Sequence, residues 1–329
     1  MRVLLRRSLL LIGAAAVALS LSPARAQERT VNFYNWSNYM APGVLENFTK
    51  ETGIKVVYDT FDANETLETR LLAGKSGYDV VVPTGYFLQR QITAKVFLKL
   101  DKSKLPNLAN AWPVVTEQLA TYDPGNNYAA NYMWGTTGIG YNVKAAQKIL
   151  GPDAKIDSWE MVFKPENLAK FRDCGIHMLD SADDILPAAL GYLGIDPNST
   201  KPADLEKAAE LVSKIRPNVR KFHSSEYLGA LASGEICFVV GWSGDIMQAR
   251  SRAAEAKNGI EIGYAIPKEG AQMFFDNLAS QKLIDPKILN DRNIYPDEAT
   301  QKKLFVINAR DPATQRVINR LWTRVKTGK

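Results

Sequence analysis

The sequence predicts an α/β fold built from two units, each a parallel-rich sheet flanked by helices. In the N-terminal half, strand-like and helix-like segments alternate as β-α-β-α-β. A second set of alternating segments begins near residue 137. No stretch rich in Gly or Ser separates the two sets, so we expect extended strands to join them.

In the first unit, β-branched and apolar runs predict three strands, and the helices between them end at glycines. We expect Asn64 to cap the second helix at its N-terminus, and Gly53 and Gly74 to end the two helices. The expected strands are residues 31–35, 55–61 and 78–83, and the expected helices are residues 42–52 and 64–73.

In the second unit, the clearest element is an amphipathic helix at residues 204–215, which places six apolar side chains on one face. Ser181 is expected to cap an earlier helix. The other expected elements are strands at residues 176–179 and 235–242, and helices at residues 181–193 and 245–257.

Residues 1–26 have the pattern of a secretion signal. A basic start is followed by an apolar run at residues 9–21, and Ala24-Arg25-Ala26 is a typical cleavage site. We expect cleavage after Ala26 and, in a Gram-negative cell, a periplasmic protein. Arg2, Arg6, Arg7 and Arg25 leave with the signal, so the net charge falls from +6 to +2 and gives no reason to expect a nucleic-acid partner.

Two cysteines, Cys174 and Cys237, are the only ones in the chain. In an oxidising compartment, a structural disulfide is the simplest interpretation of such a pair. A metal site is disfavoured because the only histidines, His177 and His223, have no ligand spacing around them. We expect neither a metal nor a cofactor.

Aromatic and acidic residues recur directly after the predicted strands. Ligands of open α/β sheets bind beyond the carboxyl ends of the strands. A short diamine needs carboxylates for its ammonium groups and aromatic rings for its methylene chain, which is what these segments offer. The segments are residues 36–39, 84–87, 180–184 and 242–245.

Each of these residues also has a purely structural interpretation. Asp184 and Asp245 could be ordinary acids in the first turn of a helix, and Trp36 and Trp242 could be core aromatics. Asp276 differs because it lies in an apolar, strand-like run, where an unpartnered carboxylate is costly. A buried structural ion pair is the alternative there.

Several segments over the whole mature chain resemble bacterial periplasmic polyamine-binding proteins, and most closely the putrescine-binding branch. The resemblance implies a two-lobed periplasmic-binding-protein fold of type II, with hinge strands. It also implies a monomer that delivers its ligand to the permease subunits of an ABC importer. The segments are residues 33–39, 50–56, 134–142, 222–225, 241–245, 266–270, 294–296 and 322–329.

The resemblance implies lobe 1 at residues 27–136, lobe 2 at residues 137–257, a return to lobe 1 at residues 258–279, and a C-terminal segment at residues 280–329 that crosses to lobe 2. It pairs Cys174 with Cys237. Asp245 and Asp276 would hold one ammonium group and Asp184 the other. The implied ligand-binding residues are Trp36, Ser37, Tyr39, Thr84, Asp184, Trp242, Asp245, Phe274 and Asp276.

The chain departs from this family at three places. Asn38 stands where relatives often have an acid, which should weaken cation binding, and Asp184 replaces a longer Glu. After Ala279, about thirty to forty residues are missing, roughly one helix–strand unit. Natural loop variation is the alternative, but the loss of a packed helix favours an internal deletion, or an engineered or misassembled sequence. In the family, the missing stretch also supplies a pocket aromatic.

The predicted function is capture of putrescine, with spermidine as the second candidate. Phe274 resembles putrescine binders, whereas Tyr86 resembles the bulkier residue of spermidine binders. The alternatives are a binding protein for another small cationic solute, for an amino acid or for a sugar, and a periplasmic hydrolase or lyase that uses Asp245 and Asp276. No nucleophile–base pair supports an enzyme.

Overall fold

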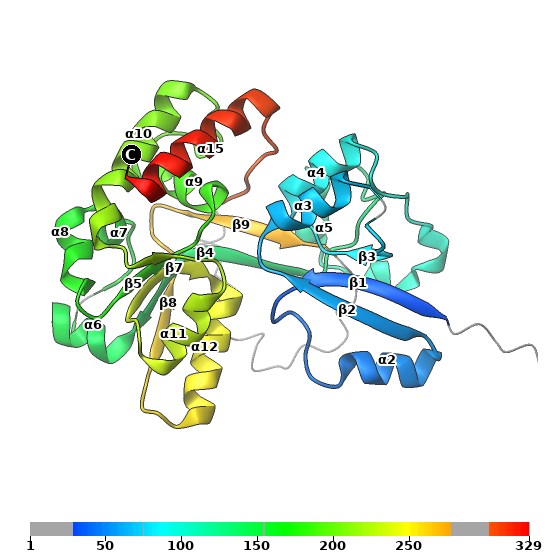
Figure 1. The fold of residues 1–329 in the computed structure, drawn as a ribbon, viewed down its shortest axis with the longest axis horizontal. Coiled ribbons are helices and arrows are strands. Elements are labelled where there is room, and N and C mark those ends of the chain that lie inside the picture. The colour runs from blue at the N-terminus through cyan, green and yellow to red at the C-terminus, as the bar shows by residue number, and fades with distance from the viewer. Residues whose placement is uncertain (1–28, 75, 154, 278–302, 329) are drawn as a thin grey trace, which may run out of the picture.

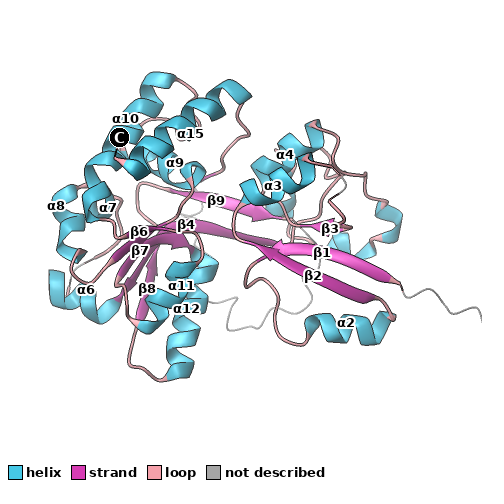
Figure 2. Cartoon of the chain, viewed as in Figure 1, coloured by secondary structure: helices cyan, strands magenta, loops and turns pink. Residues whose placement is uncertain are grey.

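The computed structural model describes residues 29–328, apart from residues 75, 154 and 278–302. The predicted signal peptide and the predicted junction after Ala279 lie outside these residues. Two lobes stand side by side, and two long strands run between them (Figure 1). The predicted α/β class is confirmed, with helices covering the sheets of both lobes (Figure 2).

The first lobe is built on a parallel sheet with the strand order β2-β1-β3. Helices α3 and α4 lie on one side of this sheet and α2 on the other (Figure 1). The strands are β1 (Thr30–Trp36), β2 (Lys55–Phe61) and β3 (Val80–Val81), and the helices are α2 (Val44–Thr52), α3 (Asn64–Leu72), α4 (Gly85–Thr93) and α5 (Pro113–Leu119).

Two details of the first lobe differ from the prediction. Strand β3 is shorter than residues 78–83, because the Val82 carbonyl accepts the Trp36 indole N–H and Pro83 has no N–H for a strand ladder. The prediction that Asn64 caps α3 is wrong. Ala63 is the cap residue, and the Asn64 side chain bonds Thr84 instead.

The second lobe contains a mixed sheet around β7, which pairs parallel with β5 and antiparallel with β4. The predicted amphipathic helix is α10, whose apolar face is buried. The strands are β4 (Met133–Asn142), β5 (Ile176–Met178), β6 (Lys221–Phe222), β7 (Phe238–Trp242) and β8 (Ile262–Ala265), and the helices are α6 (Val143–Leu150), α7 (Glu160–Phe163), α8 (Pro165–Leu168), α9 (Ala182–Tyr192), α10 (Pro202–Ile215), α11 (Glu226–Ser233) and α12 (Ser243–Ala256).

Strands β4 and β9 (Ala271–Asp276) connect the lobes. The first half of β4 pairs with β9 and its second half with β7 and β8. A bridge between Thr84 and Asp276 ties β9 to the first lobe. The predicted boundary at residues 136 and 137 falls inside β4, where its partner changes, but the lobe boundaries themselves stay a prediction.

The C-terminal part of the described chain returns to the second lobe. Strand β10 (Leu304–Phe305) pairs parallel with β9, and α15 (Pro312–Thr327) packs on α10. Trp322 and Lys326 of this helix both bond the Asp180 carboxylate. Within the described ranges, no helix has the length and apolar character needed to cross a membrane.

Cys174 and Cys237 form a disulfide, as predicted, with their Cα atoms 5.6 Å apart. The bond links the residues before β5 to the start of β7, two neighbouring strands of the second lobe. It therefore closes a loop of 63 residues within one folded unit.

We expect the double variant Cys174→Ser, Cys237→Ser to lose about 2–4 kcal/mol of unfolding free energy, because the unfolded chain gains the freedom that the bond removed. Urea denaturation followed by circular dichroism measures this loss. Dithiothreitol should destabilise the parent protein and leave the double variant unchanged; equal sensitivity of the two would contradict the prediction.

Candidate functional site: a pocket between the lobes

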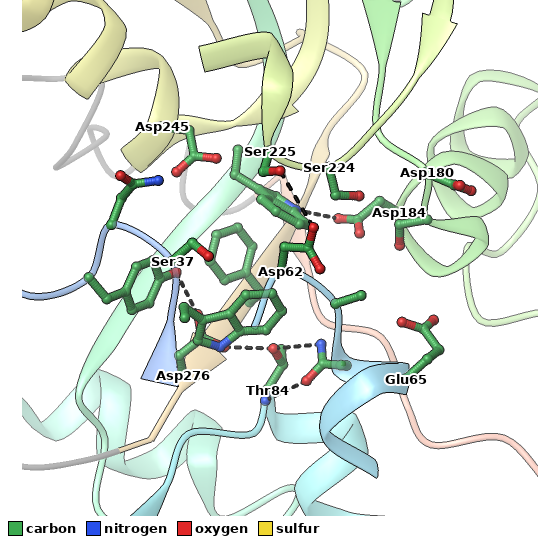
Figure 3. Close-up of a pocket in the computed structure, with 18 of the residues that line it drawn as sticks. Ser37, Asp62, Glu65, Thr84, Asp180, Asp184, Ser224, Ser225, Asp245 and Asp276 are labelled. Carbon is green, nitrogen blue, oxygen red and sulfur yellow. Dashed lines mark hydrogen bonds between the residues drawn. The ribbon is translucent and has the colours of Figure 1, made fainter. Parts of the chain in front are cut away.

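A pocket of about 670 Å³, including space open to solvent, lies between the two lobes. All nine predicted ligand-binding residues line it, and they come from both lobes and from β9. Figure 3 shows the labelled side chains converging on this space. Whether they bind a ligand stays a prediction.

Aromatic rings form the walls of the pocket. Trp36, at the end of β1, meets Trp242, at the end of β7, edge-on, with the ring centroids 5.8 Å apart. Trp242 also meets Phe274 of β9 at 6.4 Å, and Tyr39 lies 6.2 Å from Trp36. Because Trp36 and Trp242 come from different lobes, this aromatic cluster also joins the lobes across the cleft.

Asp276 is 1% exposed and accepts two hydrogen bonds. The Thr84 hydroxyl donates to Oδ1 at 2.6 Å and the Tyr39 hydroxyl donates to Oδ2 at 2.8 Å. Burial, together with the nearby Asp184, raises the pKa of Asp276 to about 7, although both hydroxyl groups oppose that shift. The structural alternative, an ion pair at Asp276, finds no partner among the described residues.

Asp245 lies in the first turn of α12 and is 9% exposed. The Tyr227 hydroxyl donates to its Oδ2 atom at 2.7 Å. Burial raises the pKa of Asp245 to about 6, while the Tyr227 hydrogen bond and the positive charge of Arg252 lower it. A helix N-terminus accounts for an acid at this position, but it does not account for its burial at the pocket wall.

Asp184, in the first turn of α9, accepts a hydrogen bond from the Thr137 hydroxyl at 2.5 Å and another from the Trp242 indole at 3.2 Å. Burial raises the pKa of this carboxyl group. In Figure 3, Asp245 and Asp276 lie toward one side of the pocket and Asp184 toward the other. The pocket thus has an acidic group at each end of an aromatic wall.

Three polar contacts join the lobes at the edge of the pocket. Asn38, which has a left-handed backbone with φ 64°, accepts from Arg252 Nη2 through its side chain and from Gln248 Nε2 through its carbonyl. Across the cleft, the Ser225 hydroxyl lies 3.5 Å from Asp62 Oδ2. Asn38 therefore lines the pocket and contacts the opposite lobe as well.

Several pocket residues were missed by the sequence analysis. Asp62 and Glu65 follow β2 directly, so the rule used for the other strands would have found them if applied to that strand. Burial, with Asp183 and Asp184 nearby, raises the pKa of Glu65 to about 7, but Glu65 is exposed as a residue and water weakens this effect. Asn38, Tyr86, Asp180 and Ser181 also line the pocket; they lie in the segments selected after the strands but are not among the nine predicted binding residues. The lining residues outside those segments are Ala63, Asn64, Ser224, Ser225 and Gln272.

The site suits a small, flexible cation. The carboxylates of Asp184, Asp245 and Asp276 are buried, and no salt bridge with a described lysine or arginine neutralises any of the three. The described residues contain no cluster of histidine, cysteine and acidic side chains that could hold a metal ion. An ammonium group placed between the carboxylates would supply the missing positive charge.

Comparisons with known proteins identify the family. Residues 43–287 match the family model of the bacterial extracellular solute-binding proteins. The chain is 44% identical to the putrescine-binding periplasmic protein PotF of Escherichia coli, over 97% of each protein, and 48% identical to the putrescine-binding periplasmic protein SpuD of Pseudomonas aeruginosa, over 92% of this chain and 94% of the relative.

Solved structures show the same architecture. A putative spermidine/putrescine ABC transporter protein from Listeria monocytogenes matches with a TM-score of 0.79 and 27% identity, over 92% of this chain and all of that one. The chain therefore belongs to the bacterial extracellular solute-binding proteins. The alignment with the Escherichia coli protein has 359 positions, more than the 329 residues of the whole chain, so part of that relative has no counterpart here.

The buried acids should make the stability of the ligand-free protein fall as pH rises. The folded-state pKa values of Asp276 and Asp245, about 7 and about 6, lie above their ordinary value of 3.8, so the folded state holds more protons than the unfolded state between these limits. Stability therefore decreases as pH rises from about 4 to about 7.

We expect the melting temperature of the ligand-free protein to be higher at pH 5 than at pH 8, as measured by scanning calorimetry. In Asp276→Asn the difference should shrink, because one of the titrating groups is gone. The exposed Asp153→Asn variant is the control and should keep the parent difference. An unchanged difference in Asp276→Asn would show that Asp276 is ionised throughout this range.

Proposed function

We propose that this protein is a periplasmic binding protein that captures putrescine between its lobes and delivers it to an ABC importer in the inner membrane. The observation that carries the proposal is the pair of acidic ends on either side of an aromatic wall. A diamine has a positive charge at each end of an apolar chain, so its charges and its methylene groups both find partners.

The names of the relatives support this proposal and define its alternatives. Two relatives are named for putrescine, and others, about a third identical, are named for spermidine and putrescine. Spermidine is thus the second candidate, and another small cationic solute the third. We also propose cleavage after Ala26 and a monomeric state, which N-terminal sequencing and light scattering of the exported protein test.

Calorimetric titration with putrescine, spermidine, glucose and glutamate tests the proposed ligand. We expect binding of putrescine, and no binding of glucose or glutamate because neither offers two positive charges. Absence of heat with both amines would overturn the proposal. Appearance of a reaction product after incubation with polyamines would favour the hydrolase or lyase alternative.

We expect Asp245→Asn and Asp276→Asn each to weaken putrescine binding at least tenfold at pH 8, about 1.4 kcal/mol, because each removes a charge that faces the ammonium group. Titration calorimetry measures the change. Asp59→Asn, on β2 outside the pocket lining, is the matched control and should bind like the parent protein. Parent-like affinity in both pocket variants would show that these acids are structural.

A further inference from the structure

One of the two hydroxyl groups that donate to Asp276, that of Thr84, and the Tyr227 hydroxyl that donates to Asp245 each accept a hydrogen bond from an amide N–H group. A hydroxyl has one proton to donate and lone pairs that accept. When an N–H group donates to the hydroxyl oxygen, the hydroxyl proton must turn to another acceptor. In both lobes that acceptor is a pocket carboxylate.

In the first lobe, the amide is the side chain of Asn64, which is 7% exposed. The Thr84 backbone N–H donates to Asn64 Oδ1 at 3.1 Å, and this contact fixes which end of the amide is oxygen. Asn64 Nδ2 then donates to Thr84 Oγ1 at 2.9 Å. The Thr84 proton is directed to Asp276 Oδ1, and this hydrogen bond favours the charged carboxylate.

In the second lobe, the hydroxyl group between an amide N–H and a carboxylate is that of the fully buried Tyr227. The Trp242 backbone N–H donates to its hydroxyl oxygen at 3.1 Å, and the hydroxyl donates to Asp245 Oδ2 at 2.7 Å. The same backbone N–H belongs to a tryptophan of the pocket wall. Tyr227 therefore ties the orientation of Asp245 to the position of the wall.

We propose that Asn64 and Tyr227 are positioning residues that favour the ionised form of Asp276 and Asp245, ready for a cation, by directing a hydroxyl hydrogen bond to each carboxylate. Neither residue needs to touch the ligand. The inference rests on the proposed binding of a diamine. It assigns to Asn64 a role beyond lining the pocket, and a role to Tyr227, which is not among the lining residues.

The charged and titratable groups around the two carboxylates do little to favour the ionised form, so the hydroxyl hydrogen bonds have that role. Asp276 faces Tyr39 from the loop after β1, Thr84 from the start of α4 and Asp184 from α9, none of which is cationic. Asp245 faces Tyr227 from α11, Tyr39 from the loop after β1 and Arg252 from its own helix. Hydrogen bonds to a charged carboxylate favour ionisation, which burial opposes.

Putrescine affinity measured by titration calorimetry from pH 6 to pH 9 in Asn64→Leu and Tyr227→Phe tests the proposal. We expect about five- to tenfold weaker binding at pH 6, with affinity returning toward that of the parent protein at pH 9, where the carboxylates are ionised without help. The pH midpoint of binding should rise by about one unit in each variant.

Tyr264→Phe is the matched control. Tyr264 is a buried tyrosine whose hydroxyl bonds Thr136 and no carboxylate, so its loss should lower stability without moving the pH midpoint. Asn64→Asp is a second variant at the first position, with an acceptor in place of the donor, and should move the midpoint in the same direction as Asn64→Leu.

The outcomes separate the two proposals. If the parent protein does not bind putrescine, the proposed function fails. If the parent protein binds and the folded variants lose the same factor of affinity at every pH, or lose none, the positioning role is wrong. Melting curves establish that each variant is folded before it is titrated.

Discussion

The burial of three carboxylates with no matching cation from the described residues is the constraint on which the site depends. Asp184, Asp245 and Asp276 are each less than a tenth exposed, and burial raises the pKa of all three. A protein selected only for stability would pair such groups or replace them. Here the free-energy cost of burying the unpaired carboxylates is retained between the lobes, where a cationic ligand can offset it.

Each of the three acids comes from a different element of the fold. Asp184 begins α9, Asp245 begins α12, and Asp276 ends β9, one of the two strands that join the lobes. Thr84 of the first lobe bonds Asp276, and Trp242 of the second lobe bonds Asp184. A cation between the acids would therefore contact groups from both lobes and stabilise this arrangement of the lobes.

Much of the fold and of the site was predictable because strand ends and pocket coincide in open α/β sheets. The rule placed Trp36 and Asp245 correctly at the pocket wall, and it would have placed Asp62 as well. It could not place Asn64 or Tyr227 in their networks, because their partners depend on contacts far away in the sequence. Asn64 has every local feature of a helix cap, yet its amide bonds Thr84, 20 residues away.

Asn38 affects cation binding through its contact with Arg252 as well as through its own lack of charge. An acid at this position could pair with Arg252, whereas Asn38 accepts only a neutral–charged hydrogen bond from it. With no carboxylate at position 38 to counter it, the positive charge of Arg252 acts more strongly on Asp245, whose pKa it lowers. Compared with an acid at this position, Asn38 gives the pocket edge one negative charge fewer and at the same time favours the ionised form of a carboxylate inside. These two effects on cation binding oppose each other, so the loss caused by Asn38 is smaller than its charge alone predicts.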